Sequence, residues 1–428
     1  YHTPPAPGPL PPPPPNWKHQ TIWTGDNLDI MRGMNSASVD LIYLDPPFNS
    51  NHDYAAPIGS KAAGAAFKDT WGLDDVNVAW HGEIKHEHPG LYALLTATRD
   101  INGASMMSYL IYMAIRLMEM RRLLKPTGSI YLHCDPYASH YLKLLMDALF
   151  GKAAFRNEIV WGYRGPGGPK MRQFNRKHDI IFWYSRDWRG AWTFNADAVR
   201  LPHHGKTIAN YKEGLNGSGH ADTPLRAGKV PETWWVEEKG NGLAIAAKQK
   251  GQHIGYPTQK PLALLRRIIR ASSNEGDLVL DPFCGCATAC IAAEMEGREW
   301  AGIDIAPKAA DLVQSRMRDE LGLFYRGAHR TDIPERSDLG EVIPYNAPRN
   351  KAYLYGEQGG YCNGCEEHFQ PRNLTVDHIV PRARGGTDHI SNLQLLCAAC
   401  NAMKGTRSHE HLLACLTDKG WVKRKNAA

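Results

Sequence analysis

The sequence lacks any apolar run long enough to cross a membrane. No stretch approaches the ~20 apolar residues that span a bilayer, and no charged-then-apolar signal segment opens the chain. We therefore expect an intracellular protein, located in the cytoplasm, with no membrane partner. In a reducing compartment, the nine cysteines are expected to be thiols or metal ligands rather than disulfides.

A strong overall charge is also missing, but one segment is basic. The chain has 50 Lys and Arg against 44 Asp and Glu, a net charge of +6. Residues 151–190 hold nine Lys and Arg against three Asp and Glu, mostly in "YRGPGGPKMRQFNRKHD", where Gly and Pro exclude a regular helix. Such a loop is either solvated surface or a clamp on the phosphates of a polyanion, and the composition leaves both open.

Composition and periodicity divide the chain into four regions. Residues 1–16 are rich in proline and are predicted to form a disordered, extended tail. Residues 17–322 alternate strand-like and helical patterns, which predicts an α/β fold with a mostly parallel sheet covered on both faces. Residues 187–252 interrupt this rhythm and are expected to be an inserted element. Residues 323–350 are predicted to be a linker, and residues 351–428, rich in Cys and His, a small second domain.

One buried strand, "VDLIYL", runs directly into Asp-Pro-Pro-Phe. In open parallel sheets, ligands bind beyond the carboxyl ends of the strands, which is where Asp45 falls. Pro46 and Pro47 fix φ and remove two donors, so the Asp45 carboxylate and the neighbouring carbonyls form a rigid acceptor cluster. A planar base with an exocyclic amino group would stack on Phe48 and donate to Asp45 and the Pro46 carbonyl. The alternative interpretation is a turn that ends the strand.

A second strand, "DLVLD", is followed by the small-residue loop "PFCGCATA" and then a helical pattern. Such a loop lets a nucleotide-like ligand approach backbone N–H groups near a helix N-terminus. The strand "REWAGIDI" then brings Asp304 about 20 residues after the loop, the spacing of an acid that binds ribose hydroxyls. Cys284, Cys286 and Cys290 could suggest a metal site, but their pattern favours small packing residues.

These motifs, in this order, resemble the permuted (β-class) amino-methyltransferases that act on DNA, across about residues 20–320. The resemblance implies a Rossmann-like, S-adenosyl-L-methionine-dependent fold whose catalytic motif is Asp45, Pro46, Pro47 and Phe48. "TGDNLDIMRGM" matches a strand end near the cofactor adenine, "YPTQKPLALLRRII" the cofactor-flanking helix and "DPFCGCAT" the cofactor loop. The implied cofactor-binding residues are Asp26, Lys260, Asp281, Phe283, Gly285, Ala287, Thr288 and Asp304.

The cofactor loop departs from the family pattern at one position. The usual Gly-Ser-Gly-Thr reads Gly-Cys-Ala-Thr here, so Ala287 replaces the second glycine. Alanine disfavours positive φ, and we therefore expect a slightly different loop geometry.

The resemblance also implies the reaction. The Asp-Pro-Pro-aromatic motif is assigned mainly to adenine, giving N6-methyladenine, with the amino group of cytosine (N4) as the alternative. The target base would have to leave a double-stranded DNA helix to reach Phe48. The Pro-Cys nucleophile that methylates a ring carbon of cytosine is absent from the sequence. Residues 187–252 would be the target-recognition region, in which His203, His204, Trp234 and Trp235 either contact bases or pack in the core.

The C-terminal region contains two Cys-x-x-Cys pairs, "CNGC" and "CAAC". Four thiolates with this spacing predict a closed, structural zinc site, formed by Cys362, Cys365, Cys397 and Cys400.

The sequence around these pairs resembles the HNH nuclease family across about residues 351–407, which implies a small zinc-stabilised ββα-metal domain. The resemblance assigns His378 as general base and Asn392 as the residue that fixes the base-carrying loop. Asp377 and Asn401 would ligate a catalytic ion, and their oxygen ligands favour Mg²⁺ or Mn²⁺ over zinc. Arg382 and Arg384 would meet DNA phosphates.

Two functional classes remain open at this stage. The first is a bifunctional enzyme that methylates DNA and cuts DNA lacking the mark, as in a fused restriction–modification protein of bacterial, phage or mobile-element origin. The second is a methyltransferase whose C-terminal zinc module binds DNA without cutting it.

Overall fold

The computed structural model describes residues 14–47, 54–55, 66–67, 89–165, 172–203, 205, 228–246, 259–322, 327–338, 342–384 and 388–421. The chain divides into two compact units. The first unit takes residues up to 70 together with 116–337, and the second takes 71–115 together with the residues from 338 onward. No helix in the described ranges is both long and apolar enough to cross a membrane.

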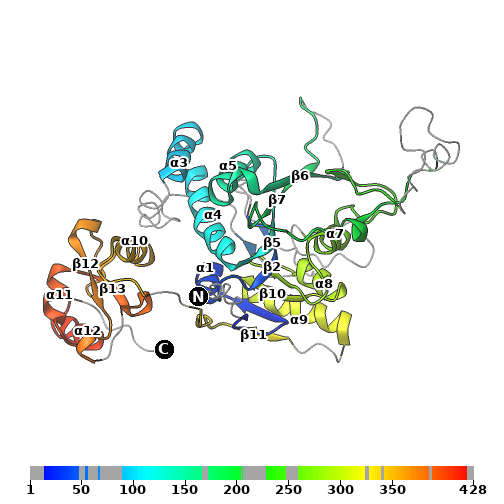
Figure 1. The fold of residues 1–428 in the computed structure, drawn as a ribbon. Coiled ribbons are helices and arrows are strands. Elements are labelled where there is room, and N and C mark those ends of the chain that lie inside the picture. Colours follow the sequence, from blue (N-terminus) through cyan, green and yellow to red (C-terminus); the bar gives the residue numbers. More distant parts are fainter. Residues whose placement is uncertain are drawn as a thin grey trace, which may run out of the picture. The chain divides into compact units, whose positions relative to one another are not determined.

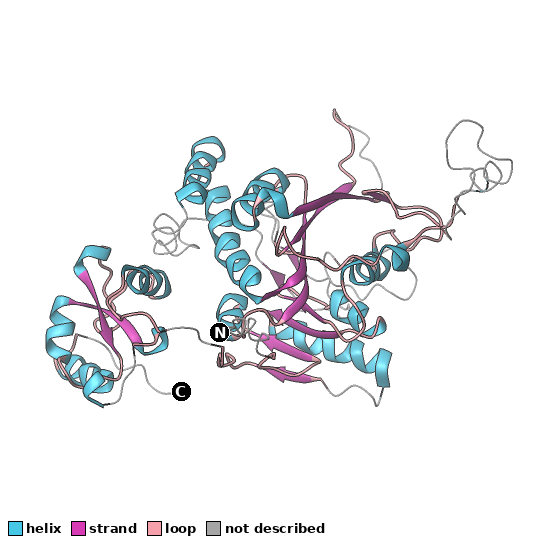
Figure 2. Cartoon of the chain, viewed as in Figure 1, coloured by secondary structure: helices cyan, strands magenta, loops and turns pink. Residues whose placement is uncertain are grey.

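The first unit is organised around one large sheet (Figures 1 and 2). Its strand order is β11-β1-β10-β9-β2-β5-β7-β6-β8. The run from β11 to β5 is parallel, whereas β7 pairs antiparallel with both β5 and β6. Their bounds are β1 (Thr21–Thr24), β2 (Val39–Leu44), β5 (Leu124–Cys134), β6 (Phe155–Gly162), β7 (His178–Ser185), β8 (Trp234–Val236), β9 (Leu278–Asp281), β10 (Glu299–Asp304) and β11 (Ala328–Arg330). The predicted α/β class with a mostly parallel sheet is confirmed.

Helices cover both faces of this sheet, which explains why β2 is buried at every position. On one face, Tyr131 of β5 contacts Ser272 of α7 through its hydroxyl, at 2.7 Å. On the other, the Tyr184 hydroxyl of β7 donates to Asp147 of α5. The helices that begin in this unit are α1 (Asn27–Gly33), α5 (Ser139–Phe150), α7 (Leu262–Ser272), α8 (Thr288–Met295) and α9 (Pro307–Leu321). Two further helices are α3 (Pro89–Asn102) and α4 (Ala104–Leu123), and β3 (Tyr54–Ala55) pairs with β4 (Ala66–Phe67).

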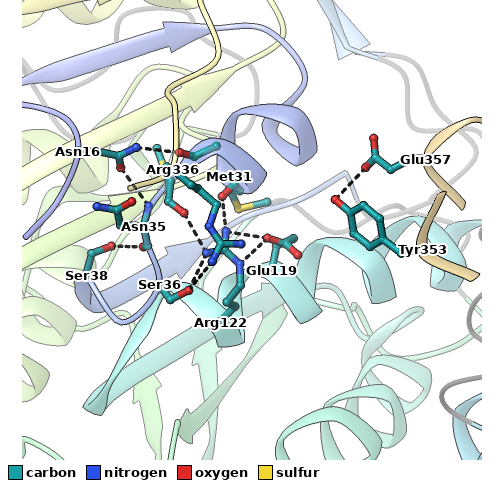
Figure 3. A network of polar contacts seen from close by, with 12 residues as sticks. Asn16, Met31, Asn35, Ser36, Ser38, Glu119, Arg122, Arg336, Tyr353 and Glu357 are labelled. Carbon is teal, nitrogen blue, oxygen red and sulfur yellow. Dashed lines mark hydrogen bonds and ion pairs between the residues drawn. The ribbon is translucent and has the colours of Figure 1, made fainter. Parts of the chain in front are cut away.

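Part of the stretch predicted as a linker belongs to the first unit. β11 adds to the sheet beside β1, and the residues after it pack against the turn between α1 and β2. The Asn35 side-chain oxygen accepts from the Ser337 backbone N–H, and the Asn35 amide donates to the Ser337 hydroxyl. Arg336 donates to Ser36 (Figure 3). A Cβ on Gly33 would lie 2.0 Å from the Pro334 carbonyl oxygen, so this close approach requires glycine.

The Pro-rich tail is described only from residue 14. Asn16, which lies beside Asn35 (Figure 3), donates to the carbonyls of Gly33 and Glu335. The Pro14 carbonyl accepts from Asn35. Residues 14–16, predicted as part of a disordered tail, therefore pack on the first unit. The remainder of the tail lies outside the described residues.

The second unit contains a two-stranded antiparallel sheet followed by a helix. β12 (Leu374–His378) pairs with β13 (Leu393–Cys397), and α11 (Ala398–Lys404) follows directly. α10 (Pro348–Glu357) and α12 (His409–Asp418) pack on the same small core, which includes Leu354, Leu395 and Leu412. This ββα arrangement is the one predicted for residues 351–428, although α10 begins inside the predicted linker.

Candidate active sites

The first candidate site lies at the carboxyl end of β2. Asp45 follows the last residue of the strand, and Lys260 Nζ lies 2.5 Å from its Oδ2. The other carboxylate oxygen, Oδ1, is buried and has no hydrogen-bond partner within the described chain. Buried acceptors are nearly always satisfied, so this oxygen is suited to a donor supplied by a ligand. Pro46 is buried beside it, and Phe48 lies outside the described residues.

Lys260 directly precedes Pro261, the N-cap of α7, and is only 7% exposed. The sequence resemblance assigns this lysine to the cofactor, whereas the structure directs its ammonium at Asp45. The two residues are 215 positions apart in the chain, so the contact arises only from the tertiary fold.

Two further carboxylates lie at the ends of the neighbouring strands β9 and β10. Burial, with a smaller contribution from Asp45 and Asp304, raises the pKa of Asp281 well above its ordinary value. Burial likewise raises the pKa of Asp304, whose carboxylate accepts 2.8 Å hydrogen bonds from the backbone N–H groups of Gly285 and Ala306. Adjacent parallel strands thus bring Asp45, Asp281 and Asp304 to one edge of the sheet.

The loop between β9 and α8 keeps a left-handed geometry despite its alanine. Ala287 has φ 54° and ψ 41°, and Gly285 has φ 48°. The Ala287 side chain is fully buried in the core. The backbone therefore holds alanine in the left-handed region, at a cost of roughly 1–2 kcal/mol. The difference from the family's loop geometry expected from the sequence stays a prediction. Asp281 Oδ1 accepts from the Phe283 N–H, and Thr288 begins α8.

Asp26 caps α1 and belongs to a second polar group behind the loop. Its Oδ1 accepts from the Leu28 N–H and from Arg116, which is itself buried. Arg116 also donates to the side chain of Asn27, whose amide donates to the Pro282 carbonyl of the loop. Arg116 was not among the site residues predicted from the sequence. The available signal was a single charged residue within the apolar run 104–118.

A buried polar chain crosses the sheet on the face that carries Asp45. The Tyr43 hydroxyl lies 2.9 Å from His133 Nδ1, and His133 Nε2 lies 3.0 Å from Asp179 Oδ2. The Tyr163 hydroxyl donates to the other Asp179 oxygen. Burial alone would raise the pKa of Asp179, but the hydrogen bonds from His133 and Tyr163 hold it below its ordinary value. The chain links β2 to Tyr163 and Asp179, the two ends of the predicted basic loop.

The two tryptophans predicted for the target-recognition region differ in their exposure to solvent. Trp234 is 59% exposed on the edge strand β8, whereas Trp235 is buried and donates to the Glu232 carbonyl. His203 is described, and His204 lies outside the described residues. Trp234 is therefore the tryptophan of this pair that is accessible to a partner.

In the second unit, His378 ends β12 and faces a carboxylate that the sequence analysis did not name. His378 Nε2 lies 2.9 Å from Asp388 Oδ1, and Arg382 donates to both oxygens of Asp388. Asp388 also accepts from the Tyr345 backbone N–H. These hydrogen bonds, led by the one from Arg382, hold the pKa of Asp388 far below its ordinary value. Arg382, expected to meet phosphates, is thus paired within the protein, and the Arg384 side chain lies outside the described residues.

Asn392 bridges the segment after His378, because its side chain both donates to and accepts from the Val380 backbone. Asn401 donates to Thr375, which places it on the face of β12 that also carries Asp377. One oxygen of Asp377 accepts from Gln394 and lies 3.0 Å from the ammonium of Lys404, a fully buried lysine. Hard divalent ions prefer oxygen ligands such as a carboxylate and an amide carbonyl, and the Asp377 carboxylate is here already paired with Lys404.

The four predicted zinc ligands come together in space. The sulfur atoms of Cys362, Cys365, Cys397 and Cys400 all lie within 4.8 Å of one another, and within the described residues this is the cluster of cysteines, histidines and acids that could hold a metal ion. Such a spread fits four thiolates around one ion about 2.3 Å from each sulfur. Cys284, Cys286 and Cys290 are instead buried separately in the core of the first unit, where burial raises the pKa of each thiol.

The DNA methylase family profile matches residues 39–315, and the HNH endonuclease profile matches residues 362–407. The DNA adenine methyltransferase YhdJ of Escherichia coli is 28% identical over 332 residues, covering 76% of this chain and 94% of that protein. The type II methyltransferase M.HpaI of Haemophilus parainfluenzae is 28% identical over 306 residues, covering 71% of this chain and 76% of that protein.

Among solved structures, the M1.HpyAVI–SAM complex is 16% identical with a TM-score of 0.41, covering 69% of this chain and 98% of that one. The cytosine-N4-specific PvuII DNA methyltransferase is 13% identical with a TM-score of 0.43, covering 81% and 94%. The family profile spans more than half of the chain, and the resemblance seen in the sequence motifs is confirmed. The chain belongs to the DNA methylase family and carries a C-terminal HNH endonuclease domain.

Proposed function

We propose that the protein transfers a methyl group from S-adenosyl-L-methionine to the exocyclic amino group of a base in double-stranded DNA, most specifically to N6 of adenine. The observation that carries this proposal is the buried Oδ1 of Asp45 at the carboxyl end of β2, which has no hydrogen-bond partner among the residues that the structure describes. An amino group donating to this oxygen and to the Pro46 carbonyl would have its nitrogen fixed in place, and alignment of this kind supplies much of the rate enhancement.

The charge at the strand ends supports the cofactor assignment. Asp45, Asp281 and Asp304 outnumber Lys260 at this edge of the sheet, and a cation beside them would favour the ionised forms of Asp281 and Asp304, which burial disfavours. When bound, S-adenosyl-L-methionine supplies a methyl group on a positively charged sulfur, which an acidic site favours. We assign the ribose to Asp304, the adenine to the Asp26 and Phe283 side of the loop, and the remaining contacts to Asp281, Gly285, Ala287 and Thr288.

Lys260 receives a different role from the one expected from the sequence. With its ammonium 2.5 Å from Oδ2, it holds the Asp45 carboxylate in one orientation and leaves Oδ1 free for the amino group. Lys260 is thus a positioning residue that acts through Asp45.

Adenine is favoured over cytosine because the Escherichia coli relative is named a DNA adenine methyltransferase and the motif reads Asp-Pro-Pro-Phe. The amino group of cytosine, which offers the same donors, remains the alternative substrate. The enzyme would act in the cytoplasm, and the protein itself would be of bacterial, phage or mobile-element origin.

A second activity is proposed for the HNH domain: cleavage of DNA with His378 as general base and Mg²⁺ or Mn²⁺ held by Asp377 and Asn401. The observation in its favour is that His378 is oriented by Asp388 while Asn392 braces the segment that follows it. A structural zinc at the four cysteines would hold the domain together. The pairing of Lys404 with Asp377 favours the alternative, a zinc module that binds DNA without cutting it.

Sequencing of methylated bases in DNA from expressing cells tests the first activity, because it identifies the base and the recognition sequence together. Asp45→Ala should abolish the mark while cofactor affinity stays within about tenfold. His378→Ala should stop divalent-dependent cutting and spare methylation. DNA methylated beforehand by His378→Ala should resist the intact enzyme if methylation gates cutting. Equal cutting of marked and unmarked DNA would contradict the restriction–modification proposal.

A further inference from the structure

One large apolar side chain of the first unit is almost wholly exposed. Phe174 is 98% exposed, the highest value among the large hydrophobic residues that the structure describes. It lies between β6 and β7, in the basic loop identified from the sequence. Leaving a phenylalanine in water forgoes the roughly 1.5–3 kcal/mol that burial of its ring would contribute, so its exposure suggests burial in a complex.

The neighbours of Phe174 indicate the chemistry of that complex. Arg172 and Arg176 on either side are exposed as well, and Lys177 follows. Residues 164–178 contain no Asp or Glu. An aromatic ring between cations, with no acid nearby, is typical of surfaces that bind nucleic acid through phosphates and base stacking.

The base of this loop is held by hydrogen bonds, and a chain of hydrogen bonds connects it to the strand that precedes Asp45. The Tyr163 N–H donates to the Lys177 carbonyl, and the Arg164 N–H donates to Glu237, just after β8. The Tyr163 hydroxyl reaches Asp179, from which the buried polar chain continues through His133 to Tyr43, two residues before Asp45. The described residues that follow β6 project from the body of the unit (Figure 1).

We propose that Phe174 is a wedge that enters the DNA helix and occupies the space left when the target base is extruded, while Arg172 and Arg176 hold the flanking phosphates. Apolar side chains inserted between base steps unstack them, and stacking on the exposed neighbouring bases compensates for the lost base–base contacts. This inference rests on the proposed methylation of DNA and adds the residue that opens the helix.

The test compares two DNA substrates that contain the recognition sequence. One is a fully paired duplex, and the other carries a mismatch at the target base, which is then already partly unstacked. Phe174→Ala should lower kcat/KM on the paired duplex by about tenfold or more, the scale of one lost stacking contact. On the mismatched duplex the loss should stay within about threefold. Phe174→Trp should retain activity on both substrates.

Two controls separate the wedge from general binding. Arg172→Ala with Arg176→Ala should weaken binding to both substrates and make the salt dependence of binding less steep, whereas Phe174→Ala should leave the salt dependence unchanged. Leu144→Ala, which removes an exposed apolar side chain from α5, should change neither substrate.

Extrusion of the target base can also be measured without methyl transfer. With 2-aminopurine as the target base, the wild-type protein should raise the fluorescence of the paired duplex, and Phe174→Ala should lose most of that increase. Equal effects of Phe174→Ala on paired and mismatched DNA, or no effect on either, would overturn the wedge. Wild-type protein that raises the fluorescence but transfers no methyl group would instead overturn the proposed reaction.

Discussion

Both candidate sites place a buried lysine against the aspartate on which their chemistry depends, but the two pairs are built differently. Lys260 approaches Asp45 from a loop before α7 at 2.5 Å, and the other carboxylate oxygen has no partner in the described part of the chain. Lys404 reaches Asp377 from the last turn of α11 at 3.0 Å, and the same oxygen also accepts from Gln394. In the first site the lysine is proposed to orient an acceptor toward a ligand, whereas in the second it pairs with the carboxylate that we propose as a ligand of the divalent ion.

The surroundings of the two pairs differ as well. Asp45 stands at the end of a strand in the middle of a large sheet with helices on both faces, so the packed sheet fixes its backbone and Lys260 orients its carboxylate. Asp377 lies on a two-stranded sheet whose small core is completed by Cys362, Cys397 and Cys400. The geometry of the second site therefore depends on the cysteine cluster, and that of the first does not.

Removing a zinc ligand should have the largest effect, because it should unfold the second site and leave the first site intact. Cys397→Ser is expected to lose the zinc and unfold the HNH domain, because structural zinc contributes about 10–16 kcal/mol in small zinc modules. Methylation should remain within about twofold of wild type. Elemental analysis and circular dichroism measure both effects, with Cys415→Ser, a cysteine outside the cluster, as the control. A folded HNH domain without zinc would contradict the structural role.

Lys404→Met should have the next largest effect. It leaves the Asp377 carboxylate without its buried counter-charge, which costs about 3–5 kcal/mol in comparable pairs. Mg²⁺ or Mn²⁺ should restore part of this loss, because the ion would replace the ammonium. Thermal unfolding with and without the ion measures this. If the ion stabilises wild type and Lys404→Met equally, Lys404 and the metal do not compete for Asp377.

Lys260→Met tests the other half of the comparison. Since Lys260 is proposed to act through Asp45, kcat should fall by about 10- to 100-fold, the scale expected for a displaced reacting group, while cofactor affinity stays within about threefold. Isothermal titration calorimetry and single-turnover kinetics separate the two quantities. Weakened cofactor binding with an unchanged kcat would instead support the cofactor role expected from the sequence.

These pairs mark the limit of what the sequence could predict. The positions of Asp45, Asp281 and Asp304 followed from apolar runs that end in an acid, and local runs of this kind determine where strands end. The lysine that each aspartate would meet could not be read from such runs, because Lys260 lies 215 residues from Asp45. The same holds for Asp388 beside His378, although only ten residues separate them, because the contact depends on how the connecting loop folds back. The three-residue β11 has no apolar pattern, which is why its segment was predicted as linker.

A smaller, pH-dependent effect is expected at Asp281. Burial raises the pKa of the Asp281 carboxyl in the folded protein above its value in the unfolded chain. The protonated carboxyl therefore contributes its full stability below the unfolded pKa, and this contribution is lost as the pH rises through the folded pKa. Asp281→Asn should therefore raise the free energy of unfolding at neutral pH by more than about 1 kcal/mol, the equivalent of roughly one pKa unit. Its advantage over wild type should shrink as the pH falls. An advantage that does not depend on pH would exclude the carboxyl charge as its cause.

The smallest effect is expected at Ala287, where the first site departs from the family pattern. Ala287→Gly would relieve the left-handed strain of about 1–2 kcal/mol. It would also remove a buried methyl group, which stabilises by about 0.8 kcal/mol, and add flexibility to the unfolded chain. These contributions oppose one another, so the free energy of unfolding should change by less than about 1 kcal/mol, as measured by denaturant titration. Ala287→Val is the control: a β-branched side chain cannot adopt φ 54° without strain, so this variant should lose more than about 2 kcal/mol. If Ala287→Gly proved the more destabilising of the two variants, Ala287 would not occupy the left-handed region in solution.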